Sequence, residues 1–417
     1  MKNNKFFLIL FLASLLINLT NAQDEIFDLT PAEKVSEEQI EKRIEEIRMG
    51  DLIIHTQPGA TVKIEQTRHE FLFGTAIPDE LAESAPRSFN EEDRKKYLQV
   101  LEQNFNYAVH ENALKWYSNE KVQGQIDYSI ADRIWEQCNE RNIPMRGHCV
   151  YWAKDEFMNN WLFPLNNAQL RKAVVDRGIS LTNHFKGRIN EFDLNNEMLH
   201  GDFFRRRLGF GVINEMAWIV KATNPEAKLY LNDYGILDMG FNSGPYIKQI
   251  NNLLDNGVPI DGIGCQGHLS MRTTMTTPSE KVQRNLDQLA EFNLPIKITE
   301  VLFAYEDEQV QVDELNKLMP IYFAHPNVEA VIMWGFWAGS HWQPHCAMWK
   351  EDWTPRLQVD AYRDLVFNKW WTQLEKKANQ NGELKERAFY GDYKITCNGV
   401  TKNIKLLKEK GSAEVNF

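Results

Sequence analysis

Short apolar runs recur along most of the chain and alternate with longer stretches of helical character. Eight runs begin 34 to 44 residues apart, at 71–77, 105–110, 145–152, 189–196, 228–233, 262–269, 296–301 and 330–337. Helix-like stretches lie between them, for example at 91–103, 169–185 and 279–292. Eight successive strand–helix units predict an α/β protein with a (β/α)8 TIM barrel. An open doubly wound sheet is the alternative, but it requires a glycine-rich phosphate turn after an early strand, and the sequence contains none.

Both ends of the chain show a different pattern, of short strands around tight turns. Residues 52–56 and 62–66 flank Pro58-Gly59, and residues 393–397 and 400–406 flank Asn398-Gly399, a type I′ turn signal. The pattern predicts one hairpin at each end. Because both ends leave a closed barrel at its bottom face, we expect the hairpins to form one small β subdomain there. Two separate decorations are the alternative.

The first residues resemble an export signal. Lys2 and Lys5 precede an apolar run at 6–19, and Ala22 ends a small-residue cleavage site. This predicts a signal peptide at 1–22 and a secreted or periplasmic protein. An uncleaved anchor is the alternative, although the run is short for a membrane span and we expect none.

A helix should follow the signal peptide. Thr30 as N-cap, Pro31 in the first turn and Glu33 three residues after the cap predict a helix that runs to about Met49. The expected division of the chain is 1–22 signal peptide, 23–70 N-terminal helix and hairpin, 71–372 barrel and 373–417 C-terminal hairpin extension.

Composition narrows the range of partners. The 417 residues carry 47 basic and 58 acidic side chains, a net charge of −11, which disfavours nucleic acid as a partner. The 12 Trp suggest surfaces that stack on flat apolar ligands such as sugar rings. Five scattered Cys show no metal-binding spacing, so we expect small buried residues, with one or two disulfides at most and no metal site.

Polar side chains gather where the predicted strands end. Seven of the eight runs end in such residues, at 110–112, 148–152, 195–197, 232–234, 266–268, 299–300 and 334–337. In a (β/α)8 barrel these ends form the face that carries the chemistry. Glu197 and Glu300 are well placed for glycosidic cleavage, which needs two carboxyl groups across the bond. For either residue alone, a helix cap or a surface charge is the alternative.

Several segments together resemble glycoside hydrolase family 10 xylanases. The segment from Asp193 to Glu197 resembles the acid/base segment of that family, and Ile298-Thr299-Glu300 resembles its nucleophile strand. Further matching segments occur in the family's order at 105–116, 146–152, 232–234, 264–268 and 334–342, so the resemblance covers about 70–370. The flanking hairpins resemble the plant-type branch of the family.

The resemblance implies a role for each matching residue. Glu197 would be the general acid/base and Glu300 the nucleophile. Asn196 would bind the sugar 2-hydroxyl, and His268 and Gln266 would orient the two carboxyl groups. The other implied contacts are all with substrate: Glu111, Asn112 and Lys115 with the next sugar, His148 with the sugar being cleaved, and Trp152, Trp334 and Trp342 as apolar walls. Tyr234 is a further expected substrate-binding residue. No cofactor is implied, because two carboxyl groups and water suffice; carboxyl groups about 5–5.5 Å apart would make the enzyme retaining.

The chain departs from the family pattern at three positions. Ala113 stands where the family commonly has Glu, Ala153 where a His is usual, and Gly235 where Asn is usual. Some members of the family, particularly plant-type ones, also lack that His, so we do not interpret these changes as inactivation. The implied activity is that of a secreted endo-1,4-β-xylanase, expected to act as a monomer on xylan or xylo-oligosaccharides. An endo-β-glucanase and a non-catalytic carbohydrate-binding barrel are the alternatives.

Overall fold

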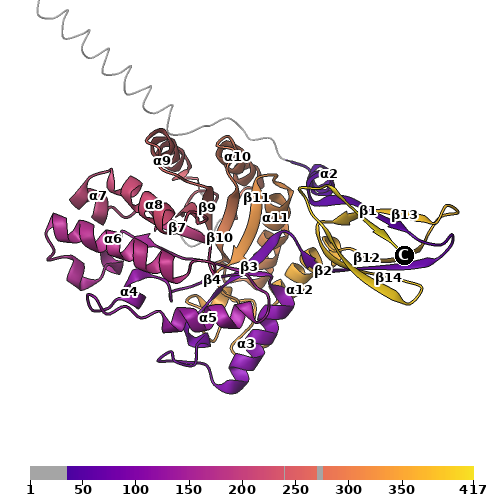
Figure 1. The fold of residues 1–417 in the computed structure, drawn as a ribbon, viewed down its shortest axis with the longest axis horizontal. Coiled ribbons are helices and arrows are strands. Elements are labelled where there is room, and N and C mark those ends of the chain that lie inside the picture. Colours follow the sequence, from indigo (N-terminus) through magenta and orange to yellow (C-terminus); the bar gives the residue numbers. More distant parts are fainter. Residues whose placement is uncertain (1–34, 239, 270–275) are drawn as a thin grey trace, which may run out of the picture.

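The computed structural model describes residues 35–238, 240–269 and 276–417. The predicted signal peptide at 1–22 lies outside these residues. Within them, the chain folds into a barrel and a smaller β sandwich, which lies beside it at the right of Figure 1.

Parallel strands form the barrel, as predicted. Along the sequence they are β3 (Leu72–Ile77), β4 (Tyr107–His110), β5 (Met145–Arg146), β6 (Tyr151–Trp152), β7 (Glu191–Asn196), β8 (Lys228–Asp233), β9 (Gly262–Leu269), β10 (Ile296–Phe303) and β11 (Val328–Met333). β5 and β6 are two parts of the predicted third strand: β5 pairs with β4, and β6 pairs with β7. Gly147 between them forms a bridge to Phe192, which closes the ring.

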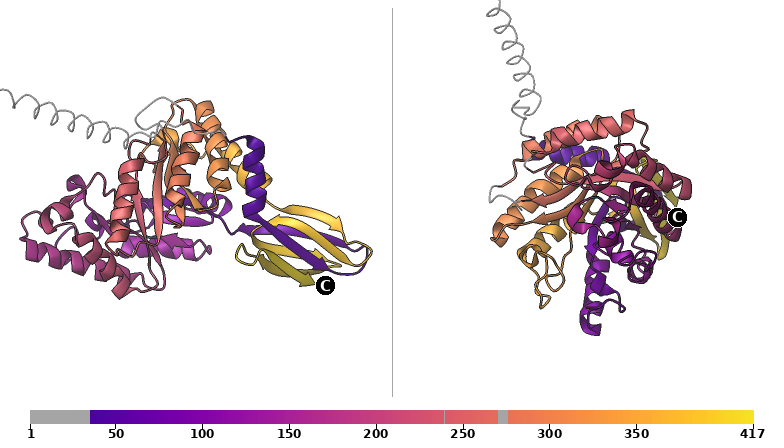
Figure 2. Two further views of the ribbon diagram at one scale, coloured as in Figure 1. Left: turned by 90° about the horizontal axis from the view of Figure 1, so that it is seen from above. Right: turned by 90° about the vertical axis from the view of Figure 1, so that its left-hand side faces the viewer.

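A helix follows each barrel strand and packs on the outside of the ring (Figures 1 and 2). These helices are α3 (Glu91–Asn104), α5 (Ser129–Asn139), α6 (Asn167–His184), α8 (Val212–Thr223), α9 (Ser243–Asp255), α10 (Ser279–Ala290), α11 (Glu308–Ala324) and α12 (Leu357–Arg363). Shorter helical segments interrupt the loops: α4 (Trp116–Asn119), α7 (Phe203–Leu208), η1 (Asp79–Leu81), η2 (Asp155–Phe157), η3 (Asn160–Leu162) and η4 (Pro344–Cys346). A π-helical segment, η5 (Asp364–Lys369), directly continues α12.

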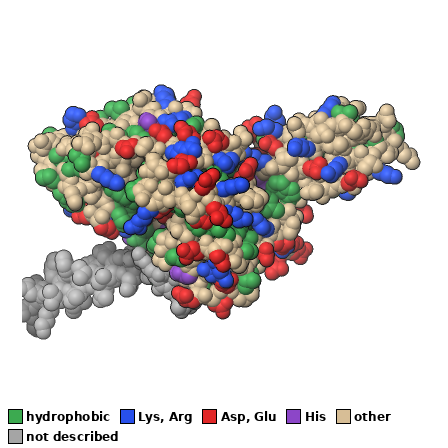
Figure 3. Space-filling model, turned by 90° about the horizontal axis from the view of Figure 1, so that it is seen from below, with side chains coloured by type: hydrophobic (Ala, Val, Ile, Leu, Met, Phe, Trp, Pro, Cys, Tyr) green, Lys and Arg blue, Asp and Glu red, His purple; other side chains and the backbone are tan. Residues whose placement is uncertain are grey.

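Burial explains why the two parts of the chain carry different patterns. Every residue of β10 is buried, because a barrel strand has the core on one side and helices on the other. In β1 (Met49–His55), buried and half-buried residues alternate, as in a strand with one face toward solvent. Acidic and basic side chains are interspersed over the face of barrel and sandwich seen in Figure 3.

The sandwich combines strands from both chain ends in two sheets. One sheet has the order β13-β1-β16 and the other β12-β2-β14-β15. Apart from β1, the strands are β2 (Thr61–His69), β12 (Gln373–Lys377), β13 (Glu383–Phe389), β14 (Gly391–Cys397), β15 (Val400–Leu406) and β16 (Ser412–Asn416). Their inward side chains form a second core, which includes Ile54, Ile64, Ile395 and Leu406.

One expectation about this subdomain is correct and another is wrong. β14 and β15 form the predicted hairpin, with Asn398 and Gly399 both at positive φ as a type I′ turn requires. β1 and β2 do not pair with each other. They lie in opposite sheets, so the chain between them crosses from one sheet to the other. Alternation predicts a strand but does not identify its partner, and here the C-terminal strands are the partners.

The first described helix also differs from the expectation. α2 (Glu37–Arg48) begins after Ser36, and residues 35 and 36 are not helical. The prediction of one continuous helix from Pro31 to about Met49 is therefore wrong at these two residues. Ser36 and Gln39 form a capping box, a second signal of the kind expected at Thr30 and Glu33.

Arg48, the last residue of α2, attaches the sandwich to the barrel. Its buried guanidinium donates to the carbonyl oxygens of Phe323, His325 and Val328, at distances of 2.7, 2.8 and 2.7 Å. Val328 is the first residue of β11, so the sandwich lies at the N-terminal ends of the barrel strands. This is the bottom face of the barrel, where the subdomain was expected.

All five cysteines are buried free thiols, and none forms a disulfide. This confirms their interpretation as small core residues. In residues 35–238, 240–269 and 276–417, no helix is both long enough and apolar enough to cross a membrane.

We predict that Ile395→Ala destabilises the sandwich by about 2–5 kcal/mol, because it leaves a cavity in a closed core. Ile395 is fully buried and pairs with Ile64 of β2. Val400→Ala is the matched control, since Val400 lies on the same hairpin and is 52% exposed. Urea unfolding followed by circular dichroism measures both variants, and equal losses would contradict this description of the core.

Candidate active site

A cavity of about 570 Å³ opens at the C-terminal ends of the barrel strands, opposite the sandwich. It brings together every residue that the sequence predicted for the site: Glu111, Asn112, Lys115, His148, Trp152, Asn196, Glu197, Tyr234, Gln266, His268, Glu300, Trp334 and Trp342. None of its lining residues comes from the sandwich. The described residues contain no group of three or more His, Cys, Asp or Glu side chains that could hold a metal ion.

Glu300 lies within β10 and is 4% exposed. Its Oε1 accepts from Asn232 Nδ2 at 2.7 Å, and its Oε2 accepts from His268 Nε2 at 3.0 Å. Burial alone would raise the pKa of this carboxyl. The hydrogen bond from His268 and the positive potential of His148, His268 and Lys115 outweigh burial and lower the pKa to about 2. Glu300 is therefore a carboxylate at neutral pH.

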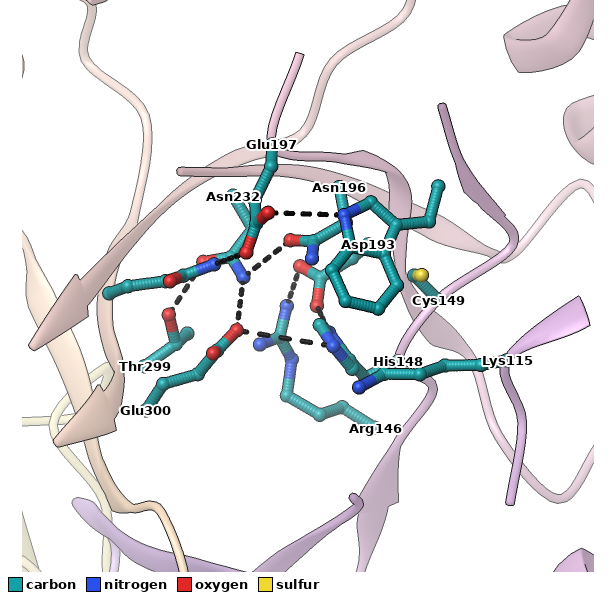
Figure 4. Close-up of polar contacts among 12 residues, drawn as sticks. Lys115, Arg146, His148, Cys149, Asp193, Asn196, Glu197, Asn232, Thr299 and Glu300 are labelled. Atoms are coloured by element: carbon teal, nitrogen blue, oxygen red, sulfur yellow. Dashed lines mark hydrogen bonds and ion pairs between the residues drawn. The ribbon is translucent and has the colours of Figure 1, made fainter. Parts of the chain in front are cut away.

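Glu197 follows β7 and receives donors from other elements. Its Oε1 accepts from Gln266 Nε2 at 2.9 Å, and its Oε2 accepts from Trp152 Nε1 at 3.1 Å. The ammonium of Lys154 lies 3.3 Å from the same Oε2. Figure 4 shows Glu197 and Glu300 on neighbouring sides of one group of polar contacts.

The backbone at both carboxyl residues is unusual. Glu197 has φ 56° and Glu300 has φ 55°, in the left-handed region that costs a residue with a Cβ about 1–2 kcal/mol. Strand register shifts on both sides of Glu300, where β10 pairs with β9 and with β11. A bulge of this kind redirects a side chain, and here it coincides with the carboxyl that the cavity exposes to ligand.

Asn232 of β8 connects the two halves of the site (Figure 4). Its amide nitrogen donates to Glu300 and also to Asn196 Oδ1, at 3.0 Å. Its amide oxygen accepts from Thr299 Oγ1 at 2.6 Å. Because Asn196 accepts through its oxygen, its own NH₂ group remains available to donate into the cavity.

A second chain of contacts fixes His148. Its Nδ1 donates to Asp193 Oδ2 at 2.8 Å, and the guanidinium of Arg146 donates to the other oxygen of Asp193. The Nε2 of His148 then lies 4.0 Å from Glu300 Oε1. Asp193 therefore sets which nitrogen of His148 faces Glu300.

The far end of the cavity carries a cation between aromatic rings. Lys115 Nζ donates to Asn112 Oδ1 at 3.0 Å and lies 4.7 Å from the Trp152 ring and 6.0 Å from the Trp334 ring. Burial raises the pKa of neighbouring Glu111 to about 7, although the charge of Lys115 acts against this.

The cavity is also lined by residues that the sequence analysis did not assign to the site: Tyr117, Lys154, Phe157, His200, Gly235, Asp238, Phe241 and Asn242. Three of them, Lys154, Phe157 and His200, contact predicted site residues. Phe157 stacks on Trp152, with ring centroids 3.9 Å apart. His200 stacks on Tyr234 at 3.8 Å and donates from Nδ1 to Asp233 at 2.8 Å. Lys154, Phe157 and His200 lie two to five residues beyond a predicted strand end, in loops at the top face of the barrel. The signal that could have indicated them is their residue type, because basic, aromatic and imidazole side chains in such loops can reach the site.

A (β/α)8 barrel with two carboxyl groups among amide, imidazole and indole donors at its C-terminal face is an arrangement that glycoside hydrolases use. The model of Glycosyl hydrolase family 10 matches residues 65–366 of this chain. The chain belongs to glycosyl hydrolase family 10.

Two relatives illustrate how far the similarity extends. The anti-sigma-I factor RsgI6 of Acetivibrio thermocellus is 34% identical over 372 residues, which cover 86% of this chain and 46% of that protein. Endo-1,4-beta-xylanase 1 of Arabidopsis thaliana is 31% identical over 408 residues, which cover 95% of this chain and 41% of that protein. The chain thus spans less than half the length of these two relatives.

Solved structures share the fold. Native xylanase 10B from Thermotoga maritima matches with a TM-score of 0.64 and 24% identity, over 72% of this chain and 96% of that one. Xylanase 10B from Thermotoga petrophila RKU-1, in complex with xylobiose, matches with a TM-score of 0.64 and 23% identity, over 81% and 99% of the two chains. The barrel is the part of the fold that the family model covers.

We predict a pH-dependent contribution of Glu300 to stability. Its pKa falls from the ordinary 4.5 to about 2 on folding, so its contribution is complete above pH 4.5 and is lost as pH falls toward 2. The free energy of unfolding of the wild type minus that of Glu300→Gln should decrease from about pH 5 to about pH 3. Chemical denaturation at several pH values measures this difference, and Glu92→Gln, exposed on α3, corrects for the loss of one charge. A difference that does not change with pH would contradict the depressed pKa.

Proposed function

We propose that this chain is an endo-1,4-β-xylanase that cleaves internal bonds of xylan with retention of anomeric configuration. The observation that carries the proposal is the pair of carboxyl groups in one cavity with different donors. Glu300 is held as a carboxylate by Asn232 and His268, whereas Glu197 is held by Gln266 and Trp152. Membership of the family and the names of the Arabidopsis and Thermotoga relatives support xylan as the substrate.

In the proposed first step, a Glu300 carboxylate oxygen attacks the anomeric carbon. The bond from that carbon to the glycosidic oxygen breaks, and Glu197 gives its proton to the departing oxygen. In the second step, Glu197 takes a proton from water while the water oxygen attacks the anomeric carbon. The ester bond to Glu300 then breaks, so both carboxyl groups return to their starting states.

The remaining lining residues fit the binding of a flat, hydroxylated chain. The free NH₂ group of Asn196 is suited to the sugar 2-hydroxyl next to the attacked carbon. Lys115 and Asn112 present a joined cation and amide to the next sugar. Trp334 lies edge-on to His148 at 5.3 Å, and Trp342, 47% exposed, forms the outer wall.

We also propose that residues 1–22 direct secretion and are removed after Ala22, on the basis of the charged and apolar segments described above. Mass spectrometry of the protein recovered outside the cytoplasm should give an N-terminus at Gln23. Recovery of a protein that still begins at Met1 would contradict this part of the proposal.

Reducing-sugar release tests the substrate. Xylose lacks the hydroxymethyl group of glucose, so a wall near Glu111 and Trp342 that leaves no room for this group would favour xylan. Soluble xylan should be cleaved much faster than mixed-linkage β-glucan. Faster cleavage of β-glucan than of xylan would indicate an endo-β-glucanase. No release of reducing sugar from either polysaccharide would indicate a non-catalytic carbohydrate-binding barrel.

We predict that Glu300→Ala reduces kcat on xylo-oligosaccharides by a factor of about 10⁴ or more, because the covalent intermediate cannot form. Azide should partly restore turnover of activated aryl xylosides and yield a glycosyl azide of inverted configuration, since azide attacks from the side that Glu300 occupied. NMR identifies the product. Near-wild-type turnover in the variant would exclude Glu300 as the nucleophile.

We predict a different result for Glu197→Ala. Loss of the acid should cost about 10²- to 10⁴-fold on unactivated xylo-oligosaccharides, because general acid catalysis contributes that much. The loss in the glycosylation step should be much smaller with a dinitrophenyl leaving group, which departs without a proton, and azide should now give a product of retained configuration. Pre-steady-state measurement of dinitrophenol release separates this step. Equal losses on both substrates would argue against the acid role.

A further inference from the structure

A lysine outside the strand ends contacts the proposed acid/base directly. Lys154 lies on the loop between β6 and η2, and its Nζ is 3.3 Å from Glu197 Oε2. Its side chain is only 19% exposed. Its other acidic partner is Glu156 at 3.5 Å, whose side chain is 61% exposed and so well screened by water.

Aromatic rings hold the ammonium in this position. Lys154 Nζ lies 5.6 Å from the centre of the Phe157 ring and 5.7 Å from that of Tyr234. Burial would lower the pKa of the ammonium, but the negative potential of Glu197, together with Tyr234, raises it above its ordinary value. Lys154 therefore stays charged where Glu197 works, and each charge of the pair favours the other.

The other titratable groups that face this part of the cavity come from several elements. Apart from Lys154 and Glu197, the titratable residues that line the cavity are Glu111, Lys115, Tyr117, His148, His200, Tyr234, Asp238, His268 and Glu300. Several of these groups have partners of their own: His268 and His148 face Glu300, His200 donates to Asp233, and Lys115 donates to Asn112. Among the described residues, Lys154 is the cationic side chain that forms an ion pair with Glu197.

We propose that Lys154 is a positioning residue that acts through Glu197 and sets the upper pH limit of activity. The first chemical step requires a proton on Glu197, and an adjacent cation favours its loss. The second step requires the ionised carboxylate, which the same cation stabilises. Lys154 thus favours the ionised form of Glu197, which acts as the base in the second step, over the protonated form, which acts as the acid in the first step. This proposal rests on the proposed function, because only a carboxyl that donates a proton is limited in this way.

The test compares kcat/KM against pH for wild type, Lys154→Met and Lys154→Arg on xylotetraose. The alkaline limb of the kcat/KM profile should move to higher pH by about half a pH unit to one pH unit in Lys154→Met, as expected for removal of one partly buried cation. Lys154→Arg retains the charge and should keep the wild-type limb. Lys172→Met on α6, where Lys172 is 75% exposed and pairs with Asp176, controls for net charge and should also leave the limb unchanged.

A second substrate separates this effect from a structural one. With a dinitrophenyl xylobioside, the departing group needs no proton, so loss of the Glu197 proton should not limit the rate. Any alkaline limb that remains with this substrate should lie at the same pH in wild type and in Lys154→Met. A limb that moves equally with both substrates, or one that stays in place with xylotetraose, would overturn the proposal. Circular dichroism and the melting temperature establish that the variant is folded, and Lys154→Gln replaces it if it is not.

The two proposals fail in distinguishable ways. Wild type without activity on xylo-oligosaccharides would overturn the proposed function. In that case an NMR titration of the Glu197 side-chain carbon, assigned with Glu197→Gln, still reports whether Lys154→Met moves its midpoint upward. An active wild type, an inactive Glu300→Ala and an unmoved limb in Lys154→Met would overturn only the role of Lys154.

Discussion

The burial of an ionised carboxylate at Glu300 is the constraint on which the rest of the site depends. A carboxylate at 4% exposure is costly unless charged or hydrogen-bonding groups replace the water it has lost. Here Asn232 reaches it from β8 and His268 from β9, while Glu300 itself comes from β10. Three neighbouring strands must keep their register for all of these donors to meet, so the site depends on the closed ring rather than on any one loop.

Charged side chains below the site show that the interior of this barrel is not simply apolar. Arg146 binds Asp193 and Glu191, and Lys297 binds Glu191 in turn. These charges are nearly or fully buried and paired, which is the condition under which burial is tolerated. Asp193 also accepts from His148, so the ion pairs in the core fix the imidazole that faces Glu300. The support for the site and the packing of the barrel are therefore the same set of contacts.

The sequence predicted the barrel and the strand-end residues because both depend on local patterns. Seven of the eight predicted strands end in residues that line the cavity, and every predicted lining residue contributes to it. Pairing within the sandwich was not predictable in this way. β1 and β2 alternate like a hairpin, yet their partners are about 300 residues away, and nothing local specifies which strand lies beside which. Lys154 and His200 were missed for a related reason: their roles arise from loops that fold back over strand ends, and spacing along the chain does not report that approach.

The two carboxyl groups differ in where their donors come from, and this difference has a functional consequence. The donors to Glu300 lie on strands, whose positions the barrel fixes. Two of the contacts of Glu197, with Trp152 and Lys154, come from the end of β6 and the loop that follows it. Phe157 of the same loop stacks on Trp152 and keeps that indole in place. Sequence changes in a surface loop cost little stability, whereas changes to strand residues disturb the core. The protonation of the proposed acid/base is therefore the property that can vary among barrels of this kind without damage to the contacts of Glu300, the proposed nucleophile.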